Sequence, residues 1–164
     1  MRDMTLTFRI VQCADDLARL DTALRALSAA ISEDYSTDRA TLTQAILGPQ
    51  PVACAILALQ DDQTRGAALY SPVFSTVRGA AGVYVSDLWV SDAARGQGLG
   101  AGLLAQVTRD SAQRWRATWL RLAAYHYSNA ALRFYARLGF TPVNDQQELR
   151  LGADGFATLI ERAG

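Results

Sequence analysis

The sequence predicts a single mixed α/β domain, and three observations lead to that prediction. Its 164 residues lie within the usual length of one domain. Half of the residues are hydrophobic and a fifth are charged, which is the balance of a globular protein with a buried core. Apolar runs of strand length also alternate along the chain with longer segments whose apolar residues recur at helical spacing. We therefore expect one domain over residues 5–164.

The first third of the chain predicts one strand and two helices. Residues 6–11 alternate between apolar and other side chains, as in a half-buried strand. Asp15 or Asp16 is then the expected N-cap of an amphipathic helix. Apolar side chains recur along that helix at its spacing: Leu17, Leu20, Leu24, Leu27 and Ile31. A polar, acidic connection follows, and a second helix over residues 39–47 is expected to end at Gly48.

The middle of the chain predicts three successive strands. Residues 52–59 form a continuous apolar run, which is typical of a strand that is buried on both faces. A turn at Asp61 and Asp62 leads to an antiparallel partner over residues 66–74. A second turn, which begins at Arg78-Gly79, leads to a strand over residues 83–90.

The last third predicts helices and short strands in alternation. The expected elements are a helix over 98–115, a strand over 119–125, a helix over 128–138 closed by Gly139, and short strands over 140–143 and 148–151. A small element that carries Phe156 ends the chain. The whole order is then β-α-α-β-β-β-α-β-α-β-β.

Charge and composition exclude several classes of partner and site. Sixteen basic and sixteen acidic residues cancel, so no field of one sign favours nucleic acid or an anionic membrane surface. No apolar run approaches the ~20 residues of a membrane span, and the N-terminus has no apolar leader segment. Two distant cysteines and the single His126 cannot form a Cys/His metal site. We therefore expect a cytoplasmic protein that binds no metal, no nucleic acid and no membrane.

A glycine-rich loop lies between the strand that ends at Val90 and the following helix. Its sequence is Arg95-Gly96-Gln97-Gly98-Leu99-Gly100. Glycines let a ligand approach the backbone closely, because they have no Cβ. The first turn of a helix also presents unpaired N–H groups and about half a positive charge. The loop therefore predicts a site for a pyrophosphate group.

Two well-known nucleotide-binding motifs also contain glycine-rich loops, and the sequence argues against both. The pattern Gly96-x-Gly98-x-x-Ala101 matches a dinucleotide fingerprint, but that fingerprint requires an acid at the end of the next strand, and residues 119–125 contain none. A nucleotide P-loop requires a lysine, and the sequence has no lysine. A glycine-rich turn that binds no ligand is the structural alternative.

A second motif follows at a fixed distance after the loop. It reads Ala131-Leu132-Arg133-Phe134-Tyr135-Ala136-Arg137-Leu138-Gly139-Phe140. With the loop before it and a strand between them, the segment over residues 83–143 resembles the GNAT superfamily of N-acetyltransferases. The resemblance implies a mixed, mostly antiparallel central sheet flanked by helices. It also implies acetyl-CoA as the co-substrate.

The resemblance carries roles over to particular residues. The backbone of Leu88, Trp89 and Val90 is expected to pair with the pantetheine arm, and the loop residues from Arg95 to Ala101 are expected to hold the pyrophosphate. Where the family usually has an asparagine that contacts CoA, this sequence has Ser128, and Asn129 follows it. Tyr135 corresponds to the tyrosine that protonates the departing thiolate. The alternative for Tyr135 is an aromatic side chain packed on the apolar face of its helix.

A finer likeness, to the diamine (spermidine/spermine-type) acetyltransferases, concerns the acceptor. Residues 83–90 are similar to their strand before the loop, but Ser86 stands where those enzymes have a glutamate before the aspartate. Asp87 would face the opposite side of a regular strand, although a β-bulge could redirect it. Tyr35 is a further candidate substrate contact. His126 is either a base or an exposed loop residue.

An acidic loop precedes the second helix, and it has two interpretations. Glu33, Asp34 and Asp38 could attract a cationic amine, or they could form a solvated turn that caps the helix.

The expected function is transfer of an acetyl group to a small primary amine, which is either a diamine or polyamine or an amino-acid-like molecule. The alternatives are an acyl-CoA-binding regulatory module without turnover and a protein N-acetyltransferase. Exposed edge strands near the C-terminus predict a homodimer, together with the apolar residues close by: Phe140, Leu149, Leu151 and Phe156.

Overall fold

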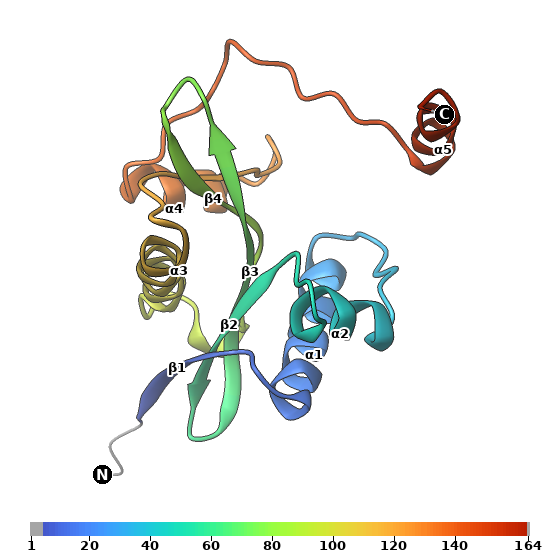
Figure 1. Ribbon diagram of the computed structural model, residues 1–164. Helices are drawn as coiled ribbons and strands as arrows, with labels where there is room; N and C mark the ends of the chain where they lie inside the picture. The colour runs from blue at the N-terminus through green and yellow to red at the C-terminus, as the bar shows by residue number, and fades with distance from the viewer. Residues whose placement is uncertain (1–4, 164) are drawn as a thin grey trace. The chain divides into compact units, whose positions relative to one another are not determined.

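The computed structural model describes residues 5–163 and has a mixed α/β architecture built on one five-stranded sheet (Figure 1). The chain divides into two compact units, of which the first ends at Ala124 and the second begins at Tyr125. Among the described residues, no helix combines the length and the apolar character needed to cross a membrane.

The first unit contains the whole sheet, with its strands in the order β1-β2-β3-β4-β5. The strands are β1 Leu6–Ile10, β2 Cys54–Gln60, β3 Gln63–Ser75, β4 Ala80–Val90 and β5 Leu120–Leu122. The pairs from β1 to β4 are antiparallel, and β4 pairs with β5 in parallel. The predicted mixed, mostly antiparallel sheet is therefore confirmed, although β5 is shorter than the predicted strand over 119–125.

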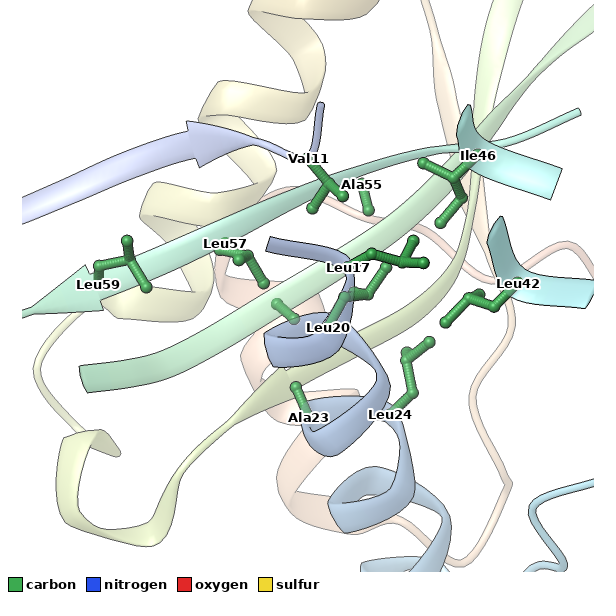
Figure 2. Packing of buried hydrophobic residues seen from close by; sticks show 11 residues of the cluster. Val11, Leu17, Leu20, Ala23, Leu24, Leu42, Ile46, Ala55, Leu57 and Leu59 are labelled. Carbon is green, nitrogen blue, oxygen red and sulfur yellow. The ribbon is translucent and has the colours of Figure 1, made fainter. Parts of the chain in front are cut away.

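Helices cover both faces of this sheet. Helices α1 (Ala14–Ala30) and α2 (Arg39–Leu47) lie on one face, and α3 (Leu99–Trp115) lies on the other (Figure 1). Figure 2 shows apolar side chains of α1 and α2 packed against alternate residues of β2. The buried members of this cluster include Leu17, Leu20, Leu24, Leu42, Ile46, Ala55, Leu57 and Leu59. The helical period of α1 and the twofold period of β2 thus bring their apolar faces together.

Helix α1 begins differently from the prediction. Its N-cap is Cys13, and no side chain bonds the first turn there. Asp15 is exposed, whereas Asp16 is buried and accepts a hydrogen bond of 3.0 Å from Arg9 on β1. A buried carboxylate needs a charged partner, and Asp16 therefore pairs with Arg9 instead of capping the helix. Asp15 does not act as the N-cap either.

Helix α3 packs closely on the sheet at two glycines. A Cβ on Gly102 would lie 2.7 Å from Cζ of Phe8 on β1. A Cβ on Gly66 of β3 would lie 2.9 Å from Leu103 Cδ1 and 3.0 Å from the carbonyl oxygen of Trp89. Only glycine fits these two contacts without a shift of its neighbours. They fix the start of α3 beside the end of β4.

The second unit contains α4 (Asn129–Arg137) and α5 (Ala153–Glu161). Gly139 closes α4 as predicted, and that glycine has a positive φ of 90°. The N–H groups of Gly139 and Phe140 donate to the carbonyls of Ala136 and Tyr135, each at 3.0 Å. The rings of Tyr135 and Phe140 pack together, with their centroids 5.4 Å apart. These bonds and this contact together form a Schellman C-cap.

The two short strands predicted over residues 140–143 and 148–151 are not formed. Both segments are irregular, and within the described residues neither takes part in a strand ladder. A strand is stabilised by its pairing with a neighbour, and an alternating sequence does not by itself supply that neighbour. The element that carries Phe156 is the helix α5.

Candidate functional site

Strands β4 and β5 part in the middle of β4. Their pairing runs from Val83–Leu120 to Val85–Leu122. Strand β4 continues to Val90 and stays paired with β3 on its other side. Within the described residues, the last five residues of β4 therefore have no strand partner on the β5 side. Such an open edge can pair with an extended ligand that carries amide groups.

The glycine-rich loop connects this open edge to α3. Its start is fixed by a hydrogen bond of 2.8 Å from the N–H of Ser91 to the carbonyl of Arg65. Gly96 and Gly98 have positive φ angles of 76° and 78°. A Cβ at either position would meet no heavy atom within 4 Å, so it is backbone conformation that requires glycine here.

The first turn of α3 is open to an anion. Gly98 is the N-cap and has no side chain to accept a hydrogen bond. The N–H of Gly102 donates to the Gly98 carbonyl at 3.0 Å. The first turn contains no acidic residue, and Leu99 and Leu103 are buried and anchor the helix. The positive end of the helix dipole is therefore free to attract a phosphate.

Two side chains hold the loop in shape. Arg95 forms an ion pair of 2.9 Å with Asp92, and both side chains are exposed. The Gln97 amide donates to the carbonyl of Ala93 at 3.0 Å. An exposed ion pair is worth ~1 kcal/mol or less, so Arg95 can exchange Asp92 for a bound anion at little cost.

A β-bulge in β4 places Ser86 and Asp87 beside the point where the strands part. Leu69 is opposite Asp87 and Tyr70 is opposite Val85, so Ser86 is the extra residue. The Ser86 hydroxyl lies 2.6 Å from Asp87 Oδ2 and 3.3 Å from the Leu69 carbonyl. A hydroxyl has one proton, and the shorter contact assigns it to Asp87.

The bulge also decides which face of the sheet Asp87 occupies. Leu69 and Trp89 both pack against the core on the α1 side. Directly opposed residues of an antiparallel pair share a face, so Asp87 lies on the α1 side with Leu69. The sequence left a redirecting bulge as an alternative, and the register of β3 and β4 confirms the bulge.

Tyr35 has its hydroxyl engaged by a buried carboxylate. Asp21 accepts from Tyr35 at 2.7 Å, from Arg39 at 2.9 Å and from Arg25 at 3.3 Å. Burial raises the pKa of Asp21, but these hydrogen bonds outweigh burial and lower the pKa below its usual value. Burial and the bond to Asp21 raise the pKa of Tyr35 to about 12. A substrate contact by Tyr35 stays a prediction.

Asp21 is a site residue that was not predicted from the sequence, although the sequence carries a signal for it. Asp21 interrupts the apolar stripe of α1 next to Leu20, and a buried acid on such a stripe requires partners.

In the acidic loop, Asp38 is the N-cap of α2, as one of the two interpretations of this loop expected. Asp38 Oδ1 accepts from the Thr41 N–H at 2.7 Å, which lowers the pKa of Asp38.

Tyr135 is half-buried on α4 in the second unit. The centroid of its ring lies 5.1 Å from that of Phe134 and 5.4 Å from that of Phe140. Burial raises the pKa of Tyr135, so the phenol keeps its proton at neutral pH. Ser128 is the N-cap of α4 without a side-chain bond, and Asn129 is exposed. These residues belong to the second unit, so their approach to the loop stays a prediction.

His126 is exposed in a turn, as one of its two interpretations expected. Nothing in the described residues singles it out as a base. The candidate site of the first unit therefore consists of the open edge of β4, the loop and the pair Ser86–Asp87.

Comparison with known proteins gives one family and several similar folds. A family model described as the acetyltransferase (GNAT) domain matches residues 46–142, which is more than half of the chain. No curated protein matches the sequence. An integron cassette protein from Vibrio cholerae is similar in structure with a TM-score of 0.77 and 20% identity, over 96% of this chain and 99% of that chain.

Two further structures carry functional names. A ribosomal-protein-alanine N-acetyltransferase from Brucella melitensis matches with a TM-score of 0.72 and 17% identity, over 90% of this chain and 100% of that one. An aminoglycoside N-acetyltransferase in complex with CoA matches with a TM-score of 0.74 and 15% identity, over 92% and 97%. At these identities the likeness shows a shared fold.

Proposed function

Because the chain belongs to the GNAT family of acetyltransferases, we propose that it transfers the acetyl group of acetyl-CoA to a small primary amine. The observation that carries the proposal is the combination of an open β4 edge and an uncapped, acid-free α3 start, joined by one short loop. The aminoglycoside enzyme of similar fold supports a small-molecule acceptor.

The residues of the first unit fit the parts of acetyl-CoA, which the family uses as its acetyl donor. The N–H groups from Leu99 to Ala101, together with Arg95, suit the pyrophosphate. The backbone of Leu88, Trp89 and Val90 suits the amides of the pantetheine arm. In the second unit, Ser128 or Asn129 is the proposed side-chain contact to CoA.

Asp87 is the proposed contact for the amine. An alkylamine with a pKa of ~10.4 is almost entirely protonated at neutral pH, and removing that proton costs roughly 4–5 kcal/mol. The carboxylate attracts the ammonium group and, through a water molecule, accepts its proton. Ser86 donates to Asp87 at 2.6 Å and holds it in place. This pair replaces the glutamate of the diamine acetyltransferases, which keeps a diamine or polyamine among the proposed acceptors beside an amino-acid-like one.

Tyr135 is the proposed acid that returns a proton to the CoA sulfur. The raised pKa of Tyr135 keeps the phenol protonated until a thiolate, with a usual pKa near ~8.5, needs the proton. This role requires Tyr135 to approach the loop when the substrates are bound.

The test is an acceptor screen with acetyl-CoA, in which free thiol is followed with a chromogenic reagent. The panel contains putrescine, spermidine, single amino acids, an aminoglycoside and a short peptide. We expect thiol release that depends on a small amine and that falls in Asp87→Asn. Tight CoA binding without release from any amine would instead identify a regulatory module, and release with the peptide alone would identify a protein N-acetyltransferase.

We also propose that the protein is a homodimer. Exposed apolar side chains of the second unit support this: Leu149, Leu151 and Phe156. The predicted edge strands do not contribute, because they are not formed, and Phe140 is packed on Tyr135. Light scattering at micromolar concentration is expected to give twice the chain mass, and a monomer mass would remove the proposal.

A further inference from the structure

A cavity of about 210 Å³ lies in the first unit where β1, β2, α2 and α3 meet. Its walls combine apolar and polar surface, and the apolar part includes Ile10 from β1 and Ile46 and Leu47 from α2. Arg114 lines it from the last turn of α3, which is about 20 Å along the helix from its start. The cavity is therefore separate from the proposed acetyl-CoA site.

The Arg114 guanidinium is held by the carboxylate of Asp110, which is a buried residue. Its Nε lies 2.9 and 2.7 Å from the two carboxylate oxygens of Asp110. Asp110 also accepts from the hydroxyl of Tyr70 at 2.7 Å, and both of these residues are buried. Within the described part of the chain, the two terminal nitrogens of Arg114 have no carboxylate partner. The guanidinium is thus oriented through Nε while its outer edge is left available.

We propose that this cavity binds a small organic carboxylate of the size of hexanoate or benzoate. The outer edge of a guanidinium pairs with a carboxylate through two parallel hydrogen bonds. The aliphatic or aromatic part would cover the apolar wall of Ile10, Ile46 and Leu47. The volume is below the ~300–1,000 Å³ of sites for drug-sized ligands, which limits the occupant to a small molecule. The described lining contains no acidic side chain that could pair with a cationic amine, so this ligand differs in class from the proposed acceptor.

Two cysteines give the proposal a test with an internal control. Cys54 lines the cavity, whereas Cys13 is exposed outside it, and both are free thiols. Burial raises the pKa of the Cys54 thiol, so alkylation by iodoacetamide is followed at alkaline pH by peptide mass spectrometry. A ligand at about four times its dissociation constant should slow alkylation of Cys54 about fivefold and leave Cys13 unchanged.

Matched ligands and variants identify what is recognised. Hexanoate and benzoate are expected to protect Cys54, and hexanol and hexylamine at the same concentrations are not. Gln12 is exposed and also lines the cavity, so it can be changed without disturbing the core. Gln12→Glu adds a like charge and should abolish protection by hexanoate, while Gln12→Met, of similar size and neutral, should retain it.

Two outcomes would overturn the proposal. One is that no carboxylate slows alkylation of Cys54 up to its solubility limit. The other is that hexanol protects Cys54 as well as hexanoate does, because the cavity would then bind apolar chains without pairing to Arg114. The readout does not involve acetyl transfer, so it is independent of whether the proposed function holds.

Discussion

The two units of this chain are stabilised in different ways. In the first, side chains such as Leu20, Leu57 and Leu103 are fully buried on both faces of a sheet. In the second, none of the described residues from 125 to 163 is buried, although α4 is closed by a complete C-cap. The first unit therefore depends on contacts between distant segments, whereas the elements of the second are specified by bonds between near neighbours.

This difference also separates the proposed roles. The open β4 edge, the loop and Asp87 belong to the packed first unit, where a rigid core holds them. Tyr135 belongs to the second unit, where its ring packs on two neighbouring aromatic residues. Variants in the core and the loop of the first unit should therefore change stability or cofactor binding, whereas variants of Asp87 and Tyr135 should change turnover.

The largest effect is expected from equal truncations in the two units. Leu20→Ala removes a fully buried side chain from the core and should lower the free energy of unfolding by about 2–5 kcal/mol. Leu159→Ala removes a side chain of α5 that is 54% exposed, and the change should stay within about 0.5 kcal/mol. Urea unfolding of both variants checks this, and equal losses would show that α5 is packed as firmly as α1.

A smaller effect is expected from Tyr135→Phe, which keeps the ring and removes the phenolic proton. General acid–base groups typically contribute about 10²–10⁴-fold, so kcat should fall at least about tenfold while acetyl-CoA affinity changes little. Steady-state kinetics with the best acceptor, together with calorimetry, measures both. If kcat stays within about twofold in a stable protein, Tyr135 is a packing residue and the acid lies elsewhere.

The smallest effect concerns the carboxylate that anchors Tyr35. Because the pKa of Asp21 is lowered in the folded state, its ionised form stabilises the fold above the unfolded value of ~3.9. That contribution is lost as the pH falls through the folded value. Asp21→Asn should be less stable at neutral pH and should lose less stability on acidification. Parallel stability curves for the two proteins would contradict this role of Asp21.

The sequence predicted the helices and inner strands well, because their signals are local. The period of α1, the apolar run of β2 and the glycine after α4 each act within a few residues. The two absent strands over 140–143 and 148–151 show the limit, since pairing partners are not visible in an alternating pattern. The loop was found from its glycines, whereas the bulge at Ser86 was only an open alternative because it depends on the register with β3.

The central claim is that the loop before α3 holds acetyl-CoA, and one pair of variants tests it most directly. Gly98 and Gly79 both have positive φ angles, 78° and 61°, and a Cβ on either would meet no heavy atom within 4 Å, so Gly→Val strains both backbones in a similar way. Only Gly98 lies at the start of α3; Gly79 lies in the turn between β3 and β4. Calorimetric titration with acetyl-CoA should show affinity at least about tenfold weaker in Gly98→Val, a loss of ~1.4 kcal/mol or more, and unchanged affinity in Gly79→Val. A folded Gly98→Val protein that binds acetyl-CoA as tightly as the unmodified protein would contradict the claim.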